Sequence, residues 1–401
     1  MQKSEVYIGR QPLLDGQKRL FAYELKFHIG MNPNGHTEPA TEALIDKIEN
    51  DIGFAAIVGS YPCVLKLPAG LLRPERIPNF SSDHLVVLAI GREVLQSADV
   101  LRNLKALKQK GYQFLLEDYM GDEQSDKLST IVNYAKIRVD NFNEPQLKEM
   151  VESLHQRDIK VIADSVETEE SYQHLLQLDF DYYLGYFFTN PTVLNNRKLS
   201  GNKLNLLQLM AKVNAPQTSF DELTEIISQD VGLSHKLLVA INHPANELPV
   251  HVETIADGLK YMGLKRLKFW VNLLMLSNME DVPQELLTTS LLNAKFCEMM
   301  AMQTGRGQEK DSYFLVGLLS HLDAFFQTTM EEVVDALPLE ESLTKALVLH
   351  EGKMGEILTV LNAMQKGDED NEHLTFDSLG IVQISNNYVA SAAWAQQAVM
   401  A

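Results

Sequence analysis

Seven polar residues end or follow short apolar segments in the first half of the chain, and their types suit metal or acid–base chemistry: Glu24, Lys66, Glu117, Asp118, Lys136, Asp164 and Glu167. If these segments are parallel strands of one barrel, their carboxyl ends meet at a single mouth. Carboxylates gathered there repel one another and are tolerated only where cations neutralise them. Two divalent metal ions about 3.5–4 Å apart would do so, and would activate water to hydrolyse a phosphodiester. The alternative, in which these residues are ordinary strand-end surface charges, is equally open at this point.

The elements that must position these residues alternate between strands and helices. Short segments with β-branched or aromatic residues predict strands over Arg19–Phe27, Ala55–Leu67, Leu85–Ile90, Gln113–Glu117, Tyr134–Val139, Lys160–Ala163 and Tyr182–Phe188. Apolar residues at helical spacing, with Thr168 as an N-cap, predict helices over Ala98–Lys110, Leu147–Arg157 and Thr168–Gln177. About seven such units in about 190 residues predict a TIM-like (β/α) barrel. A doubly wound sheet is the alternative, although no GxGxxG loop follows any of these strands.

After residue 200 the pattern becomes helical throughout. Apolar periodicity and start signals, such as Thr218 and Ser219 before Phe220 and Ser234 before His235, support this interpretation. Helices are predicted over Leu204–Val213, Phe220–Asp230, Leu233–Asn242, Ile255–Met262, Leu264–Leu276, Leu286–Met302, Ser312–Phe326, Met330–Leu337, Glu341–Leu349 and Gly355–Met364. We therefore predict an α/β barrel domain over 1–197 and an all-helical domain over 198–401.

The acidic balance of the chain limits its partners. The 401 residues carry 54 Asp and Glu against 35 Lys and Arg, a formal net charge of −19. This disfavours general nucleic-acid binding, because that binding depends on a surplus of positive charge. The two cysteines, Cys63 and Cys297, cannot form a disulfide framework or a zinc site. Since the N-terminus lacks the apolar run of a signal peptide and no apolar stretch approaches the ~18 residues that span a bilayer, we expect a soluble, cytoplasmic protein without a membrane partner.

Five strand-end segments carry motifs in a fixed order: Ala22–Lys26, Glu117–Met120, Lys136–Arg138, Ala163–Glu167 and Leu184–Tyr186 followed by Pro191. They resemble the Glu-Ala-Leu, Asp-Asp-Phe-Gly, Lys-Ile-Asp, Ala-Glu-Gly-Val-Glu and Gln-Gly-Tyr motifs of the EAL family of cyclic di-GMP phosphodiesterases, which are metal-dependent barrels. Each match is short, but their order, spacing and strand-end placement agree. The resemblance implies Mg²⁺ or Mn²⁺ as cofactor, catalytic roles for Lys136 and Asp164, and metal ligands at Glu24, Glu117, Asp118 and Glu167.

Three positions depart from that pattern. Where the EAL pattern has a metal-binding Asn, a metal-binding Glu and a Gln, this sequence has Lys66, Ala89 and Leu184. A protonated ammonium has no lone pair for a metal, and alanine has no donor atom. Glu117 and Asp164 are also carboxylates of altered length, and a displacement of about 1 Å already costs catalysis. Lys66 is instead expected to form salt bridges with the acids and to stabilise the mouth without metal.

Four stretches of the helical half match a second module: Leu206–Asn214, Val231–Asn242, Ile255–Leu274 and Phe314–Leu322. They resemble the HDOD domain, a helical module related to the HD phosphohydrolases. Those hydrolases bind metal through an adjacent His-Asp pair, and Ser320 and His321 stand at the two positions here. Asp323 lies two residues further on and does not share a helical face with His321. We therefore expect His321 to be a hydrogen-bonded helix residue.

Together the two resemblances imply a bacterial EAL–HDOD signalling protein. The lost ligand positions favour a non-catalytic scaffold that needs no cofactor, binds a protein partner, could bind cyclic di-GMP, and acts in motility or biofilm regulation. The alternative is an active or weakly active phosphodiesterase that uses Mg²⁺ or Mn²⁺ and releases the linear dinucleotide. Arg10, in the segment Gly9–Pro12 of a hairpin before the first strand, is either a phosphate contact or a surface arginine packed on its neighbour. A homodimer, common among active barrels of this type, is left open because Met120–Gln124 replaces the loop that normally supports it.

Overall fold

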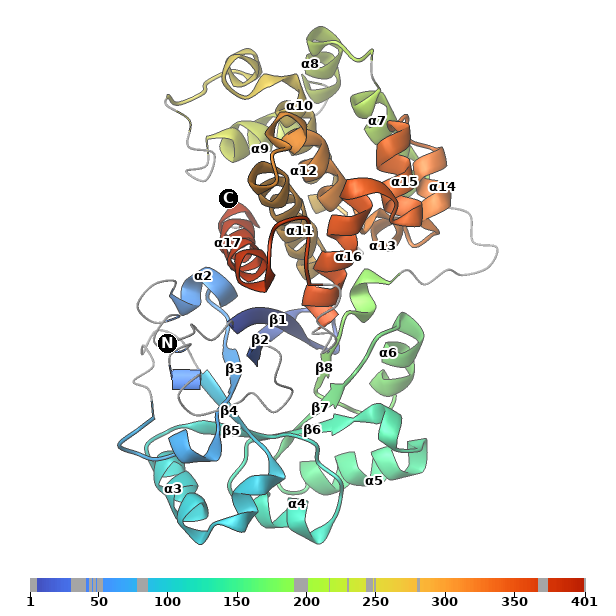
Figure 1. The fold of residues 1–401 in the computed structure, drawn as a ribbon. Coiled ribbons are helices and arrows are strands. Elements are labelled where there is room, and N and C mark those ends of the chain that lie inside the picture. The colour runs from blue at the N-terminus through green and yellow to red at the C-terminus, as the bar shows by residue number, and fades with distance from the viewer. Residues whose placement is uncertain are drawn as a thin grey trace. The chain divides into compact units, whose positions relative to one another are not determined.

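The computed structural model divides the chain into two units, which are described separately. It describes residues 6–29, 41, 42, 45, 48, 53–77, 86–190, 201–215, 217–228, 231–242, 248, 250–279, 282–366 and 374–399. The first unit comprises 1–188 with 364–372 and 381–389, and the second comprises 189–363 with 373–380 and 390–401. In Figure 1 the first unit contains the strands labelled β1 to β8, and the second contains the helices labelled α7 to α15.

Eight strands of the first unit close into a barrel in sequence order. Strands β2 to β8 run parallel to their neighbours, whereas β1 pairs antiparallel with both β2 and β8 and so closes the barrel. The predicted (β/α) barrel is therefore confirmed. The strands are β1 Val6–Asp15, β2 Leu20–Ile29, β3 Cys63–Lys66, β4 Val86–Ile90, β5 Gln113–Leu116, β6 Tyr134–Arg138, β7 Lys160–Asp164 and β8 Tyr182–Leu184.

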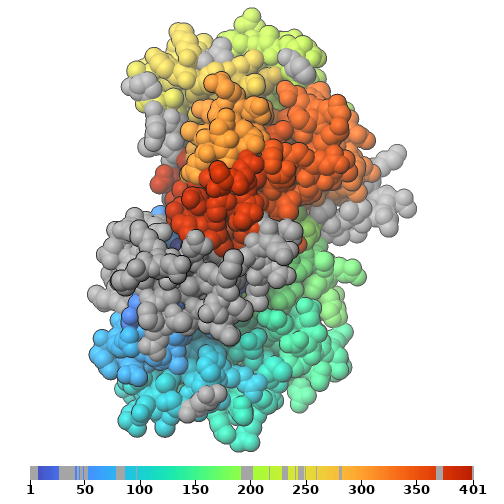
Figure 2. Space-filling view, in the orientation of Figure 1, coloured from blue at the N-terminus to red at the C-terminus, as the bar shows by residue number. Residues whose placement is uncertain are grey.

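Polar caps begin several of the helices that connect these strands. Thr168 Oγ1 accepts a hydrogen bond from the N–H of Ser171, which confirms its predicted N-cap role. Asn143 and Gln146 form a reciprocal capping box at the start of the preceding helix. The helices are α2 Phe54–Val58, α3 Ala98–Gln109, α4 Glu123–Leu128, α5 Glu144–His155 and α6 Glu169–Leu176. In Figure 2 the side chains of residues 86–188 are coloured from light blue to green.

The predicted strand Ala55–Leu67 is wrong in its first half, where residues Phe54–Val58 form α2. Gly53 and Gly59 flank this helix with φ values of 81° and 64°. Only glycine adopts such angles without strain, so the two glycines let the chain enter and leave a short helix before β3 begins.

The ends of the barrel sheet also differ from the prediction. The hairpin expected around Gly9–Pro12 extends into the ten residues of β1, which forms one whole wall of the barrel. The strand expected over Tyr182–Phe188 ends at Leu184. A Cβ atom on Gly185 would lie 2.0 Å from the carbonyl oxygen of Val166, so the chain turns away there at a contact that only glycine permits.

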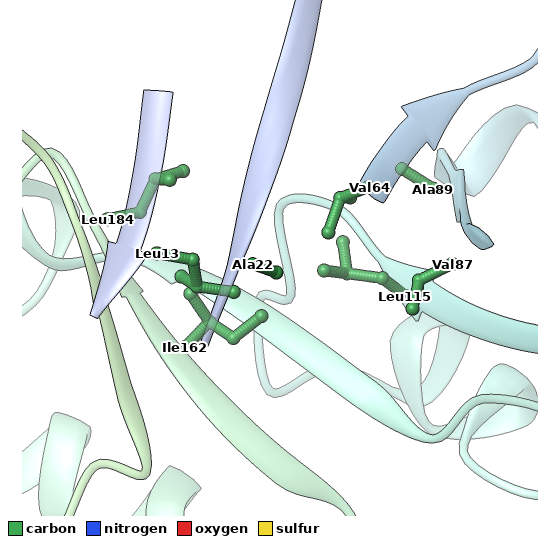
Figure 3. Close-up of a cluster of buried hydrophobic side chains, with 8 residues drawn as sticks. All are labelled: Leu13, Ala22, Val64, Val87, Ala89, Leu115, Ile162 and Leu184. Atoms are coloured by element: carbon green, nitrogen blue, oxygen red, sulfur yellow. The ribbon is translucent and has the colours of Figure 1, made fainter. Parts of the chain in front are cut away.

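Alternate residues along the strands fill the interior of the barrel, as period-two alternation requires. Two residues beyond Ala22, Val64 and Ile162, the same alternation carries a polar residue on three strands. These polar residues, Glu24, Lys66 and Asp164, form a polar layer next to the apolar cluster. The cluster consists of Leu13, Ala22, Val64, Val87, Ala89, Leu115, Ile162 and Leu184 (Figure 3).

The second unit is built from helices, as predicted. Its helices are α7 Gly201–Asn214, α8 Phe220–Ser228, α9 Val231–Ile241, α10 Ile255–Ser277, α11 Gln284–Gln303, α12 Lys310–Leu319, α13 Leu322–Phe326, α14 Met330–Asp335 and α15 Glu341–Leu349. The last two helices, α16 Gly352–Lys366 and α17 Ile381–Val399, contribute residues to both units. Within the described residues, no helix is both long enough and apolar enough to cross a membrane.

Gly263, with a φ of 78°, interrupts α10 where the sequence predicts one helix ending and the next beginning, so this prediction agrees with the structure. Other details of the helix predictions differ. The predicted helix Ser312–Phe326 breaks into α12 and α13 at Ser320 and His321. Helix α17 was not predicted. Ser234 does not begin α9, which starts three residues earlier; its Oγ instead donates to the carbonyl of Ile227.

Candidate functional site

Four charged side chains form a chain of ion pairs at the carboxyl end of the barrel. Lys136 Nζ lies 2.7 Å from Oε1 of Glu24 and 3.3 Å from Oε1 of Glu117. Lys66 Nζ lies 2.5 Å from the other oxygen of Glu117, Oε2. The salt bridge predicted between Lys66 and the strand-end acids is therefore confirmed. We call Glu24, Lys136, Glu117 and Lys66 the mouth cluster.

The members of the mouth cluster differ in their access to water. The side chains of Lys136, Glu24 and Glu117 are only 9 %, 9 % and 10 % exposed, whereas that of Lys66 is 41 % exposed. A buried charge is costly unless it is paired. The charges of Lys136, Glu24 and Glu117 are therefore stabilised mainly by one another, whereas the ammonium of Lys66 is also solvated by water.

Neighbouring charges keep Lys136 and Glu117 ionised. Burial alone would lower the pKa of Lys136, but the carboxylates of Glu24, Glu117 and Asp164 overcome this and hold it above its ordinary value. Burial likewise acts to raise the pKa of Glu117, but Lys136 and Lys66 more than offset it, so that this pKa lies below its ordinary value. A lysine whose pKa is raised is a poor general base near neutral pH, because it retains its proton there.

Asp164, the other residue with a predicted catalytic role, lies at the end of β7 and is 8 % exposed. Its Oδ1 accepts a hydrogen bond from the N–H of Ser165 at 2.8 Å. Its charge also acts on Lys136 through space. Asp164 therefore completes the negative surroundings of this ammonium.

The structure brings together only part of the predicted ligand set. Glu24 and Glu117 share the ammonium of Lys136, whereas Asp118 and Glu167 are both exposed to solvent. Asp118 has a left-handed backbone, with a φ of 49°. Within the part of the chain that the structure describes, no three His, Cys, Asp or Glu side chains are grouped so as to hold a metal ion.

The positions that depart from the EAL pattern face the barrel interior. Ala89 and Leu184 belong to the apolar cluster below the mouth and are 0 % and 1 % exposed (Figure 3). Neither offers a donor atom, and the ammonium groups of Lys66 and Lys136 pair with both oxygens of Glu117 and with one oxygen of Glu24. As arranged here, these residues do not fit a cage for two divalent cations.

Arg10 is buried, at 3 % exposure, rather than on the hairpin surface. Its Nη1 donates to the carbonyl of Ile57 at 2.7 Å, and its guanidinium lies 4.4 Å from the centre of the Tyr23 ring. Its own carbonyl accepts a hydrogen bond from the hydroxyl of Tyr186. These contacts give Arg10 a role in joining β1, β2 and α2.

Gln11 also belongs to the polar layer, whereas from the sequence a candidate contact in this segment is assigned to Arg10 alone. It lies opposite Glu24 in the β1–β2 register and is 4 % exposed. Gln11 Oε1 and Glu24 Oε2 both lack hydrogen-bond partners among the described residues. The alternation of Gln11 with the interior residue Leu13 is the sequence signal that could have placed it there.

The second unit carries a neutral polar cluster where the helical resemblance places metal ligands. Asn293 Nδ2 donates to Ser320 Oγ at 3.0 Å and lies 3.1 Å from Nε2 of His321. Burial lowers the pKa of His321 to about 4, so its ring is neutral near pH 7 and Nε2 can accept from Asn293. Burial raises the pKa of Asp323 to about 6. The expected hydrogen bonding of His321 is confirmed, although it lies between two helices rather than within one.

Two protein families match the chain. Residues 74–191 match the EAL domain, and residues 204–354 match the HDOD domain. The cyclic di-GMP phosphodiesterase CdgJ of Vibrio cholerae is 26 % identical over 401 residues, covering 97 % of this chain and 92 % of that protein. The uncharacterized protein YuxH of Bacillus subtilis is 24 % identical over 377 residues, covering 91 % of this chain and 92 % of that protein.

Solved structures of EAL proteins resemble the barrel half more distantly. PaMucR phosphodiesterase, solved as a c-di-GMP complex, is 17 % identical with a TM-score of 0.39, covering 46 % of this chain and 95 % of that one. BlrP1 of Klebsiella pneumoniae, solved at pH 6 as a manganese/cy-diGMP complex, is 19 % identical with a TM-score of 0.36, covering 47 % and 56 %. The chain therefore contains one segment that matches the EAL domain and, after it, one segment that matches the HDOD domain.

Proposed function

We propose that this protein is a non-catalytic signal-transduction scaffold that binds a protein partner. Cyclic di-GMP is the candidate ligand of its barrel. Its output would lie in motility or biofilm regulation, as the EAL–HDOD resemblance implies. The observation that carries the proposal is the mouth cluster, in which Lys136 and Lys66 hold the acids that a catalytic metal pair would need.

The energetics of the mouth cluster support this proposal. A divalent ion on Glu117 would have to displace the ammonium groups of Lys136 and Lys66, and one on Glu24 would lie beside the ammonium of Lys136. Like charges about 4 Å apart repel by about 4 kcal/mol at an effective dielectric constant of about 20. Ala89 and Leu184 would supply no ligand atom in return. A metal pair would therefore gain little electrostatic stabilisation at the mouth and would lack protein ligand atoms at two positions.

A hydrolysis assay tests the proposal. Purified full-length protein with cyclic di-GMP and Mg²⁺ or Mn²⁺ is expected to release no more linear dinucleotide than its Glu24→Ala variant does. Turnover by the native chain that is lost in Glu24→Ala would refute the scaffold function. The exposed residue Glu123, which pairs with Lys127 on α4, provides the matched control as Glu123→Ala.

Calorimetric titration with cyclic di-GMP distinguishes a scaffold that binds this ligand from one that binds only proteins. Guanine and phosphate contacts need not involve metal, so binding can persist without hydrolysis. Saturable heat in the absence of divalent cations would identify a ligand-sensing scaffold. A flat titration would restrict the proposal to protein–protein binding.

A second function, an active or weakly active phosphodiesterase, is favoured by the relative CdgJ, whose name states that activity. In that case Glu24, Glu117, Asp118 and Glu167 would hold the metal, and Lys136 and Asp164 would position the attacking water. Crystals soaked in manganese discriminate between the two functions. Two anomalous peaks bridged by these acids would establish the second, and a mouth without peaks at millimolar manganese would oppose it.

A further inference from the structure

A cavity of about 310 Å³ lies within the second unit. Its walls are the end of α7, the middle of α10, the beginning of α12 and the segment leading into α15. Helix α10 contacts α7 and α12, and α12 contacts α15; Figure 1 labels these four helices. The volume falls in the range of about 300–1,000 Å³ that small-molecule sites occupy. The apolar lining residues are Leu264, Phe269, Phe314, Leu315, Pro338, Leu339 and Leu343.

Two aromatic rings provide a rigid apolar wall. The centres of the Phe269 and Phe314 rings lie 4.3 Å apart with an angle of 71° between their planes. This edge-to-face arrangement is a favourable one for aromatic pairs and holds both rings in place. A flat apolar body can therefore pack here without first ordering the wall.

Lys268 places a poorly compensated positive charge at this cavity. Its Nζ donates to the carbonyl of Ala215 at 2.9 Å. Burial lowers its pKa, an effect that the distant carboxylate of Glu222 only partly opposes. Within the described ranges of the chain no carboxylate lies within salt-bridge distance of Lys268 or of Lys265, which lines the cavity one turn earlier. An ammonium has three donors, so Lys268 retains hydrogen-bonding capacity for a ligand.

Two acids limit the charge that a ligand can carry. Asp311 on α12 and Glu340 at the start of α15 also line the cavity. A dianionic group such as a phosphate would meet these carboxylates as well as the lysines, whereas a single carboxylate can lie against Lys268 with less repulsion. The charge pattern therefore favours a monoanion.

We propose that this cavity binds a small aromatic carboxylate, with the carboxylate on the ammonium of Lys268 and the aromatic body against Phe269 and Phe314. Such a ligand would form an ion pair with the partly buried ammonium of Lys268 and would also cover the rings of Phe269 and Phe314. This inference concerns the helical unit alone and does not depend on the function proposed for the barrel.

Fluorine NMR of the full-length protein with 4-fluorophenylacetate tests this proposal. The neutral isostere 4-fluorophenylacetamide has nearly the same shape, so it reports the apolar contribution alone. We expect the carboxylate to bind about tenfold more tightly than the amide, because only the carboxylate can form a charge-assisted hydrogen bond with the ammonium of Lys268. Lys268→Met is expected to abolish this preference, and Lys260→Met is expected to preserve it, because Lys260 is an exposed residue of the same helix that pairs with Asp257.

Each result bears on the proposal. Equal affinities for acid and amide in the native chain would overturn it, as would the absence of binding at millimolar probe. Loss of the preference in Lys260→Met to the same degree as in Lys268→Met would also overturn it. If Lys268→Met fails to fold, the comparison of acid with amide in the native chain still decides the charge requirement. Ser312→Phe, which fills the cavity from α12, is expected to weaken both probes.

Discussion

The two units bury polar side chains in opposite ways. In the barrel the mouth cluster consists of ionised groups, in which Lys136 lies between Glu24 and Glu117. In the helical unit the cluster of Asn293 and His321 is neutral and is held by hydrogen bonds. Both clusters include positions where the family resemblance expects metal ligands, but one is built from internal ion pairs and the other from neutral groups.

This difference predicts different sensitivities. An ion-pair cluster keeps its charge balance over a wide pH range but suffers when one member is removed, since a buried charge is then left alone. A neutral cluster with a buried histidine tolerates the loss of a single hydrogen bond better, yet responds to protons within the range where histidine and aspartate titrate. We therefore expect single substitutions to lower the stability of the barrel more, and changes of pH to affect the stability of the helical unit more.

The largest effect is expected from Lys136→Met. Removing this ammonium leaves Glu24 buried without a cation, and breaking a buried pair in this way typically costs about 3–5 kcal/mol of unfolding free energy. Hydrogen exchange of peptides from β2, β5 and β6 in increasing urea would measure the loss in the barrel separately. Lys160→Met is the matched control on β7, because its side chain is 56 % exposed, and it should cost under about 1 kcal/mol.

A charge-balanced variant sharpens this result. Adding Glu24→Gln to Lys136→Met removes the unpaired carboxylate, so the double variant is expected to be more stable than Lys136→Met alone. If the double variant is less stable, Glu24 is not the group whose charge Lys136 compensates, and the ion-pair account of the mouth is wrong.

The next effect concerns the apolar cluster under the mouth. Leu184→Gln restores the residue type of the EAL pattern, but it buries an amide where Leu184 is 1 % exposed. We expect a loss of about 2–4 kcal/mol from lost packing and the unpaired polar group, measured by the same exchange experiment. Leu176→Gln on α6, where the side chain is 39 % exposed, should change stability by less than about 0.5 kcal/mol. Equal effects of the two variants would mean that position 184 faces a polar site.

A smaller effect concerns pH in the helical unit, which tryptophan fluorescence reports because Trp270 and Trp394 both belong to that unit. The folded pKa of His321, about 4, lies below its unfolded value of 6.5, so His321 makes the free energy of unfolding rise as pH increases from 4 to 6.5. The folded pKa of Asp323, about 6, lies above its unfolded value of 3.8, so Asp323 makes that free energy fall as pH increases from 3.8 to 6. In the native chain the two contributions oppose each other.

Single variants separate these contributions. His321→Gln leaves only the contribution of Asp323, so its free energy of unfolding should fall by about 2–3 kcal/mol between pH 4 and 6. Asp323→Asn leaves only that of His321 and should rise by a similar amount between pH 4 and 6.5. Urea titrations at four pH values would measure both slopes. Slopes of the same sign in the two variants would contradict the assignment of opposite shifts.

Much of this comparison could be predicted from the sequence where local patterns decide the structure. Period-two alternation places Lys66 and Asp164 at strand ends, and helical periodicity predicts most of the second unit. The pairing of Lys66 with an acid follows from gathering opposite charges at one mouth. Helix α17 escaped prediction because its polar and small residues, such as those in Ser385–Asn387, weaken the apolar signal.

Long-range contacts account for what the sequence did not reveal. The bridge from Lys136 to Glu24 joins residues 112 positions apart, and it depends on barrel closure by β1 rather than on any local motif. Arg10 is buried because the carbonyl of Ile57 and the ring of Tyr23 meet it from other elements. Burial also sets the pKa of His321, and no pattern of neighbouring residue types predicts it.

The smallest effect is expected from Lys66→Asn, which places the residue type of the EAL pattern at the outer end of the mouth cluster. Lys66 Nζ lies 2.5 Å from Glu117 Oε2, but the Lys66 side chain is 41 % exposed, so solvent screens the pair and the loss of unfolding free energy should be under about 1 kcal/mol.

The same variant should change the pH dependence of stability. The lowered pKa of Glu117 in the folded state stabilises the barrel above pH 4.5, the unfolded pKa, and this stability is lost as pH falls through the folded pKa. Without Lys66 the folded pKa is depressed less, so the acid-induced loss should be smaller and should be complete at a higher pH in urea titrations of the variant. About 0.5 M salt should reduce the difference between native chain and variant, because it screens exposed pairs more than buried ones. A loss as large as that of Lys136→Met would show that the outer ammonium is as indispensable as the inner one, and that all four charges act as a single unit.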